Sequence, residues 1–245
     1  LIRTIGDPDI RFREDPVRCL RAIKFAARLG FALESLTLDA LRRTRSELKK
    51  SAPPRILEEL NRFGREGAAR PTFDMLRDTG LLEEILPEIA ASASGGAWEL
   101  LGELLGHLDS TRSKDGRDIR TGEILAVLLL PGLAGRAGRA DVHSRLDGPL
   151  RSIGQRLRVP RRELEHCRLV LAMLTRMLQG GRVEHAARRG GNQRDGFPDA
   201  QWMFGVISRF RGTDSAAMLE TLAASNLQPA PDAAGLRPED AAGTG

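Results

Sequence analysis

Helix signals cover almost the whole chain, and they restrict the fold more than any other feature. Apolar residues recur three and four positions apart, whereas no segment alternates in the manner of a half-exposed strand, and no Asn-Gly or Asp-Gly turn joins two such segments. We therefore predict an all-α, multi-helical protein with no substantial sheet. The predicted helices cover residues 16–29, 38–50, 54–66, 68–79, 81–86, 98–109, 119–130, 142–157, 161–179, 198–211 and 214–224.

The composition excludes several classes of protein. The chain has 245 residues, of which 41% are hydrophobic, and no apolar run approaches the length of a membrane span. Cys19 and Cys167 lie too far apart in sequence for a disulfide framework or a four-thiolate zinc site. We expect a cytoplasmic protein with one large or two small cores. Because the chain begins at Leu1, within an already patterned stretch, we also expect a fragment.

Positive charge lies at both ends of the chain. Residues 1–70 contain 16 basic and 10 acidic side chains, residues 71–130 contain 5 and 11, and the remainder contains 17 and 12. Basic regions of this kind are typical of proteins that bind phosphate-bearing partners. A coding bias explains the pattern equally well, because 34 of the 38 basic residues are Arg. Charge alone leaves both explanations open.

The helix predicted over residues 16–29 carries its charge on one side. A helical wheel places Arg18, Arg21, Lys24 and Arg28 on that side together with Asp15, while apolar residues occupy the side that packs inward. A solvated basic face, with Asp15 as the N-terminal cap, is the ordinary explanation. The alternative is a binding site for a nucleotide.

Asp15 and Arg18 together have the hydrogen-bonding pattern of a pairing base. The carboxylate accepts hydrogen bonds and the guanidinium donates them. Adenine and cytosine each present an amino donor beside a ring-nitrogen acceptor, whereas guanine and uracil present the opposite pattern. The pair would therefore admit A or C and reject G or U. Arg21 and Lys24, further along the same side, would hold the triphosphate.

Three stretches resemble bacterial class II nucleotidyltransferases, the superfamily of poly(A) polymerase I and the tRNA CCA-adding enzymes. Residues 2–31, which include Glu-Asp-Pro-Val-Arg at 14–18, resemble the third and fourth motifs of that superfamily. Residues 53–60, Pro-Pro-Arg-Ile-Leu-Glu-Glu-Leu, resemble the fifth motif. Residues 76–89 resemble the RNA-binding segment that follows. The resemblance covers about the first 90 residues.

The resemblance implies a head, neck, body and tail architecture in which the neck selects the incoming nucleotide. It assigns base reading to Asp15 and Arg18, with Glu14 alongside. It assigns phosphate contacts to Arg21 and, with a departure, to Lys24, because Arg is more usual at that position and Lys lacks the planar fork of a guanidinium. In the fifth motif, it makes Arg55 and Glu59 supporting residues that hold the neck helix.

The catalytic head of the family has no counterpart in this chain. That head carries a Gly-Ser motif and an Asp-x-Asp pair, which bind two Mg²⁺ ions for attack of the RNA 3′ hydroxyl on the α-phosphate of ATP. Asp7-Pro8-Asp9 has the right residues but directly precedes the neck helix, and we predict a turn there. We therefore expect this chain to bind no metal and to be inactive alone.

The later part of the chain favours poly(A) polymerase over a CCA-adding enzyme. Many CCA-adding relatives continue into a phosphohydrolase domain with a His-Asp pair, but residues 125–131 are apolar here. Residues 153–162 and the helices after them instead resemble the arginine-rich C-terminal domain of poly(A) polymerase I. Arg158, Arg161 and Arg162 are the candidates for RNA contacts; a solvated helix start would explain them equally well.

We thus predict three regions. Residues 1–90 form the neck and RNA-binding body with the nucleotide-selecting helix, residues 91–226 form a helical body and tail, and residues 227–245 form a disordered tail. The predicted partners are RNA 3′ ends and ATP, the substrate, with no membrane and no DNA. The predicted function is that of the nucleotide-selecting and RNA-binding part of a polynucleotide adenylyltransferase. The alternatives are a CCA-adding enzyme and a non-catalytic helical RNA-binding module.

Overall fold

The computed structural model describes residues 1–92, 95–115, 118–134, 142–178 and 196–224, and this part of the chain is all-α. The predicted fold class is therefore confirmed. Within the described residues, the one strand-like feature is an isolated bridge between Ile2 and Leu33. The elements are α1 (Pro8–Glu14), α2 (Val17–Leu29), α3 (Ser35–Thr44), the 3₁₀ helix η1 (Arg45–Lys50), α4 (Pro53–Arg65), α5 (Ala69–Thr79), α6 (Leu81–Ile85), α7 (Pro87–Ser92), α8 (Gly96–Asp115), α9 (Thr121–Ala134), α10 (Val142–Leu157), α11 (Arg161–Leu178) and α14 (Phe197–Ala224).

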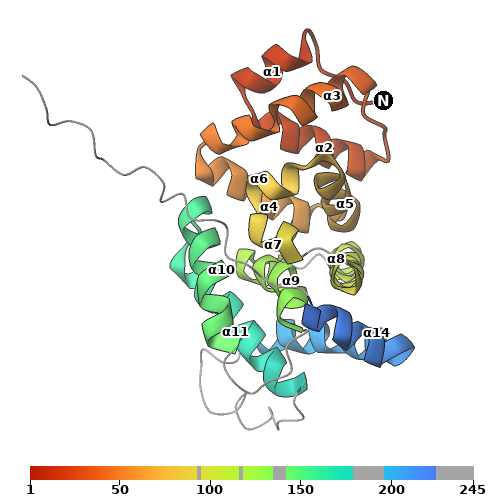
Figure 1. Ribbon diagram of the computed structural model, residues 1–245, viewed down its shortest axis with the longest axis vertical. Coiled ribbons are helices and arrows are strands. Elements are labelled where there is room, and N and C mark those ends of the chain that lie inside the picture. Colours follow the sequence, from red (N-terminus) through yellow and green to blue (C-terminus); the bar gives the residue numbers. More distant parts are fainter. Residues whose placement is uncertain (93–94, 116–117, 135–141, 179–195, 225–245) are drawn as a thin grey trace, which may run out of the picture.

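The helices follow one another along an elongated molecule, with α1 to α3 at one end, α4 to α7 in the middle, and α8 to α14 at the other end (Figure 1). One hydrophobic cluster runs through it, from Phe12 in α1 to Ile207 in α14. Helix α9 contacts α7, α8, α11 and α14. Residues 124–130 of α9 are all buried, which explains why this helix is apolar on every side.

The structure differs from the sequence prediction at several boundaries. Asp7-Pro8-Asp9 is not an isolated turn but the start of α1, since the Asp7 side chain accepts a hydrogen bond from the Asp9 N–H and proline occupies the first turn. The helix predicted over 38–50 divides into α3 and η1. The two helices predicted over 198–211 and 214–224 are a single helix, α14. The disordered tail predicted over residues 227–245 lies outside the described residues.

A distant side chain caps α5. Asp109, on α8, accepts hydrogen bonds from the N–H groups of Ala69 and Arg70, at 2.7 and 3.1 Å. Local sequence offers α5 no such acceptor, because its N-cap residue is Ala68. Helix α8 therefore determines where α5 begins, although about 40 residues separate them in the chain.

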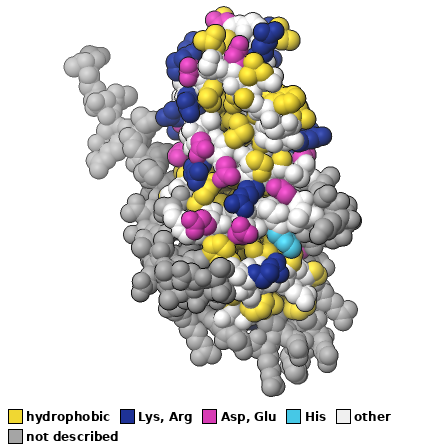
Figure 2. Space-filling view, turned by 90° about the vertical axis from the view of Figure 1, so that its right-hand side faces the viewer, with side chains coloured by type: hydrophobic (Ala, Val, Ile, Leu, Met, Phe, Trp, Pro, Cys, Tyr) yellow, Lys and Arg dark blue, Asp and Glu magenta, His cyan; other side chains and the backbone are white. Residues whose placement is uncertain are grey.

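Charged side chains of both signs lie side by side over much of the face shown in Figure 2. Exposed apolar side chains gather at the α1 to α3 end, where Ile5 is 88% and Leu36 is 65% exposed. Phe25 and Phe31 are also exposed there. None of the helices in the described part of the chain is long and apolar enough to cross a lipid bilayer.

Close helix contact at Gly122 yields the first prediction. A Cβ atom at this position, in the first turn of α9, would lie 2.5 Å from the Glu163 carbonyl oxygen and 3.0 Å from the His166 Cβ. We expect Gly122→Ala to lower the free energy of unfolding by about 3 kcal/mol, because backbone cannot move aside as a flexible side chain can. Urea unfolding measures the change.

Gly148 is the matched control. It lies within α10, and an added Cβ would meet nothing within 4 Å. Gly148→Ala should raise the free energy of unfolding by about 0.5–1 kcal/mol, because alanine is the better helix former. Equal effects of the two substitutions would contradict the close packing of α9 on α11.

Candidate functional site

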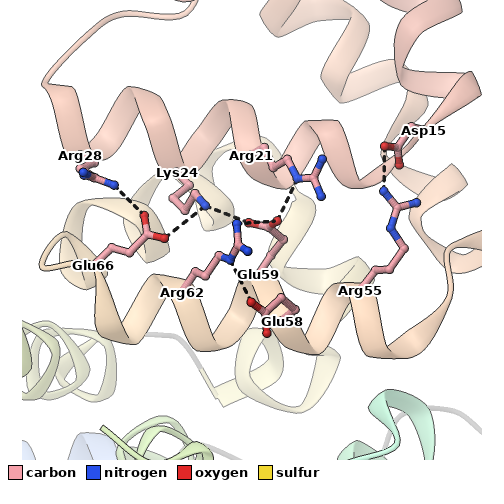
Figure 3. Close-up of polar contacts among 9 residues, drawn as sticks. All are labelled: Asp15, Arg21, Lys24, Arg28, Arg55, Glu58, Glu59, Arg62 and Glu66. Atoms are coloured by element: carbon pink, nitrogen blue, oxygen red, sulfur yellow. Dashed lines mark hydrogen bonds and ion pairs between the residues drawn. The ribbon is translucent and has the colours of Figure 1, made fainter. Parts of the chain in front are cut away.

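The candidate site lies at the junction of α1 and α2. Asp15 is the first of the two residues between them, with extended backbone (φ −145°, ψ 92°), and its N–H donates to the carbonyl of Arg11. The predicted capping role of Asp15 is wrong: Pro16 is the N-cap residue of α2, and no side-chain hydrogen bond caps that helix. The Asp15 carboxylate instead faces α4, where Arg55 Nη2 donates to its Oδ2 at 2.8 Å (Figure 3).

One oxygen of Asp15 has no hydrogen-bond partner. Asp15 Oδ1 is buried and receives no donor, although its twin Oδ2 accepts from Arg55. Burial raises the pKa of Asp15, but the hydrogen bond and charge of Arg55, the charge of Arg21 and the nearby backbone N–H of Val17 outweigh it and hold the pKa below the ordinary value. The carboxylate is therefore ionised at neutral pH, with one acceptor atom left unused.

Arg18 and Glu14 lie beside Asp15. The Arg18 Nε lies 3.9 Å from Asp15 Oδ2, and its Nη1 lies 3.4 Å from Glu14 Oε2. The Arg18 side chain is 42% exposed. The structure thus brings together the three residues at which the sequence predicts base reading, with acceptor and donor groups side by side.

The remaining cations of α2 face α4, as the view in Figure 3 shows. Arg21 Nε donates to Glu59 Oε1 at 2.9 Å, and Lys24 Nζ donates to Glu59 Oε2 at 3.1 Å. Glu66 continues the series, accepting from Lys24 at 3.5 Å and from Arg28 at 3.0 Å. We call these contacts the α2–α4 ion ladder.

Burial separates the two cations predicted to face phosphates. Arg21 is 42% exposed, whereas the Lys24 side chain is 4% exposed and its ammonium faces two carboxylates. Burial raises the pKa of Glu59, yet its hydrogen bonds and charge interactions with Arg21 and Lys24 hold the pKa below the ordinary value. Sequence reasoning missed Glu66, although its position seven residues after Glu59 places it on the same side of α4.

Arg158, Arg161 and Arg162 lie at a different place, where α10 ends and α11 begins. Arg158 follows α10 with a left-handed backbone (φ 53°), and the N–H of Val159 donates to the Gly154 carbonyl, which is the hydrogen bond of a Schellman motif. The Arg161 and Arg162 side chains are 91% and 81% exposed. These three residues therefore stand in solvent, apart from Asp15 and Arg18.

Cys19, Cys167 and His166 are all buried. The Cys19 thiol is buried, and burial raises its pKa to about 12, so it is not a nucleophile at neutral pH. Burial also raises the pKa of Cys167. The His166 Nε2 lies 2.8 Å from the Asp199 carboxylate. The residues that the structure describes contain no group of three or more His, Cys, Asp or Glu side chains arranged to hold a metal ion.

Comparison with known proteins identifies the first third of the chain. Residues 30–92 match a family model described as the probable RNA and SrmB-binding site of polymerase A. Poly(A) polymerase I of Haemophilus influenzae is 38% identical over 90 residues, which make up 37% of this chain and 20% of the relative. The CCA-adding enzyme of Lactobacillus helveticus is 39% identical over 90 residues, or 37% of this chain and 22% of the relative.

Solved structures share the fold over a longer stretch. A tRNA-processing enzyme complex superposes with a TM-score of 0.57 at 18% identity, covering 84% of this chain and 53% of the other. A CCA-adding enzyme in complex with ATP superposes with a TM-score of 0.54 at 18% identity, covering 82% and 48%.

The first third of the chain is therefore similar to a segment of both poly(A) polymerase I and CCA-adding enzymes, and residues 30–92 of it match the model of an RNA-binding site. The matched segment spans about a fifth of the length of these relatives. The two kinds of enzyme match it about equally well, so the comparison leaves the choice between them open.

The burial of Glu59 predicts an acid-sensitive stability. Glu59→Gln removes the shared partner of Arg21 and Lys24 and leaves a buried ammonium with one carboxylate, so it should cost about 3 kcal/mol at pH 7. Because the folded-state pKa lies below the ordinary 4.5, the stabilisation is fully present above pH 4.5 and is lost as the pH falls through the lowered value. Urea unfolding across this range should show the two proteins converging in stability.

Glu58→Gln is the control for this experiment. Glu58 is the preceding residue, is 57% exposed, and pairs with Arg62 on the surface. Its removal should change the free energy of unfolding by less than about 0.5 kcal/mol. Similar costs for both glutamates would mean that Glu59 is not the partner that keeps Lys24 buried.

The left-handed backbone of Arg158 gives a third prediction. Arg158→Gly and Arg158→Ala remove the same cation, but only glycine adopts this conformation without strain. The glycine variant should therefore be more stable than the alanine variant by about 1 kcal/mol in thermal unfolding. Equal stabilities would contradict the Schellman geometry at the end of α10.

Proposed function

We propose that this chain is the nucleotide-selecting and RNA-binding part of an RNA nucleotidyltransferase that adds AMP from ATP to RNA 3′ ends. The observation that supports this most directly is the arrangement of Asp15 and Arg18. An ionised carboxylate with one unused acceptor atom lies beside a half-exposed guanidinium. This combination offers the acceptor and the donor that the pairing edge of adenine requires.

In the proposed mechanism, the Asp15 side chain turns so that its carboxylate, whose Oδ1 is buried in the structure, accepts a hydrogen bond from the exocyclic amino group of adenine, and Arg18 donates to the neighbouring ring nitrogen. Guanine would present its carbonyl to the carboxylate and its N–H to the guanidinium, which places acceptor against acceptor and donor against donor. Each bidentate contact of this kind discriminates by about 1–3 kcal/mol. Arg55 keeps Asp15 ionised and fixes its orientation.

The phosphates of the nucleotide would lie further along α2. Arg21 is the half-exposed cation on that side and is the proposed phosphate contact. Lys24 is enclosed by Glu59 and Glu66, so we propose that it acts through the position of α2 and not through direct contact. The two Mg²⁺ ions of the family's reaction would be held by a catalytic head supplied outside these residues, and this chain alone would not transfer nucleotides.

Poly(A) addition is the product we favour. The support is the arginine-rich sequence around Arg158, Arg161 and Arg162, together with the apolar character of α9 at the place where many CCA-adding relatives carry a His-Asp metal pair. The match to CCA-adding enzymes, in sequence and in fold, favours the alternative. Among the residues described, nothing distinguishes a chain that reads A from one that reads A and C.

Arg18→Ala tests the base-reading role. In a protein that joins this chain to a two-metal catalytic head, the variant should lose discrimination between ATP and GTP by about tenfold or more, because the donor that rejects guanine is gone. The measurement is kcat/KM for each nucleotide. Arg13→Ala, which removes an exposed arginine on α1, is the matched control and should leave discrimination unchanged. Unchanged selectivity in Arg18→Ala would remove Arg18 from the site.

The protein that joins this chain to a catalytic head also tests whether the product is poly(A) or CCA. It is given an unstructured RNA, and separately a tRNA that ends before CCA, with ATP alone and with ATP plus CTP. Long tails from ATP alone on the unstructured RNA support poly(A) polymerase. Addition that requires CTP and stops after CCA would establish the CCA-adding alternative, and RNA binding without any addition would establish the non-catalytic module.

A further inference from the structure

A pocket of about 790 Å³ lies between α8 and α14, at the end of the molecule away from α1 and α2 (Figure 1). Its α8 wall contains residues that recur at helical spacing and therefore share one face of that helix. These residues are Glu103, Gly106, His107 and Ser110, and the α14 wall contributes Arg209 and Phe210. The volume lies within the range of about 300–1,000 Å³ that is usual for pockets that hold small molecules.

Each wall of the pocket carries an aromatic ring, His107 on α8 and Phe210 on α14. The His107 ring stacks on Trp202, with centroids 4.9 Å apart and planes inclined by 18°. Trp202 is itself fixed, because its Nε1 donates to Oε1 of the buried Glu123 at 3.0 Å. The position of the His107 ring is therefore set before any ligand arrives, and a flat ring that enters the pocket can contact aromatic surface on both walls.

The charged residues of the lining favour an anion. Glu103 Oε1 accepts from Arg70 Nη1 at 3.2 Å, so an arginine outside the lining offsets its negative charge. Arg209, on the α14 wall, is exposed. A guanidinium has five N–H donors and matches the geometry of a carboxylate or a phosphate. The acidic group of a ligand would therefore lie toward Arg209.

Gly106 leaves space in the α8 wall. It lies inside a long helix, where most residues are better helix formers than glycine. An added Cβ would meet only Arg70, at 3.9 Å from Cδ and 4.0 Å from Nη1, and both are ordinary van der Waals contacts. A larger side chain at this position could therefore enter the pocket without disturbing the packing of α8.

We propose that this pocket binds a small molecule in which a flat aromatic ring carries an anionic group. A free mononucleotide and an aromatic carboxylate both have this chemistry. The ring lies between His107 and Phe210, and the phosphate or carboxylate contacts Arg209. The site contains none of the residues of the proposed function, so the two proposals are independent. Because Trp202 stacks on His107, its indole reports on whether the pocket is occupied.

The test follows the indole N–H signal of Trp202 by NMR while the 245-residue chain is titrated with small molecules. The chain has two tryptophans, so Trp98→Phe identifies the signal. AMP and benzoate should shift it, and whichever binds more tightly indicates the source of the ligand. Adenosine, which lacks the anion, should bind at least about tenfold more weakly than AMP. Ribose 5-phosphate, which lacks the ring, should leave the signal unchanged.

Two substitutions examine the two parts of the pocket. Gly106→Leu fills the space beside the His107 ring and should weaken the binding of AMP and benzoate by about tenfold or more. Gly148→Leu is the matched control, because it adds the same side chain on α10, where an added Cβ meets nothing within 4 Å. Arg209→Gln should weaken the binding of AMP but not of adenosine, whereas a purely structural role would weaken both. Circular dichroism establishes that each variant is folded.

Four results would overturn the proposal. The first is that neither AMP nor benzoate shifts the Trp202 signal, and the second is that both bind Gly106→Leu as tightly as the original chain. The third is that Arg18→Ala abolishes the shift caused by AMP, which would assign that nucleotide to the site at Asp15 and leave the proposed function standing. The fourth is a shift caused by an unstructured RNA but by neither small molecule.

Discussion

The carboxylate of Glu59 is the interaction on which the candidate site depends. It is almost fully buried and has cationic partners on both α2 and α4, namely Arg21, Lys24 and Arg62. An ammonium as deeply buried as that of Lys24 is tolerable only with such partners. The ion ladder therefore fixes α2 against α4, and this places Asp15 within reach of Arg55. The contact between Asp15 and Arg55 at the start of α2 thus depends on the ion pairs that Glu59 makes with the middle of the same helix.

Helix α4 connects the region around Asp15 with the rest of the molecule. One side carries Arg55 and Glu59 toward α2, while Ile56, Leu60 and Phe63 belong to the core. Its last turns meet α9, where Asn61 and Arg65 bond to residues at the start of that helix. This one helix therefore contacts α2, the hydrophobic core and α9.

The sequence alone predicts the all-α fold and the shared location of Asp15 and Arg18, because helical periodicity and a spacing of three residues depend only on local geometry. The environment of Lys24 could not be predicted, since its partners Glu59 and Glu66 come from a helix more than 30 residues away. The cap of α5 by Asp109 was missed for the same reason. Helical periodicity shows on which side of a helix a charged residue lies. Whether that residue is buried depends on which other helix packs against that side.

Helix α9 also determines how the protein can be divided. Its residues 124–130 are buried on all sides by α7, α8, α11 and α14. A fragment that ends before α11 would leave this apolar helix in contact with water on at least one side, and such surfaces associate with one another. Helix α9 and the helices packed on it, α7, α8, α11 and α14, therefore form one cooperative unit. Proteolysis between them should yield insoluble pieces in place of smaller folded domains.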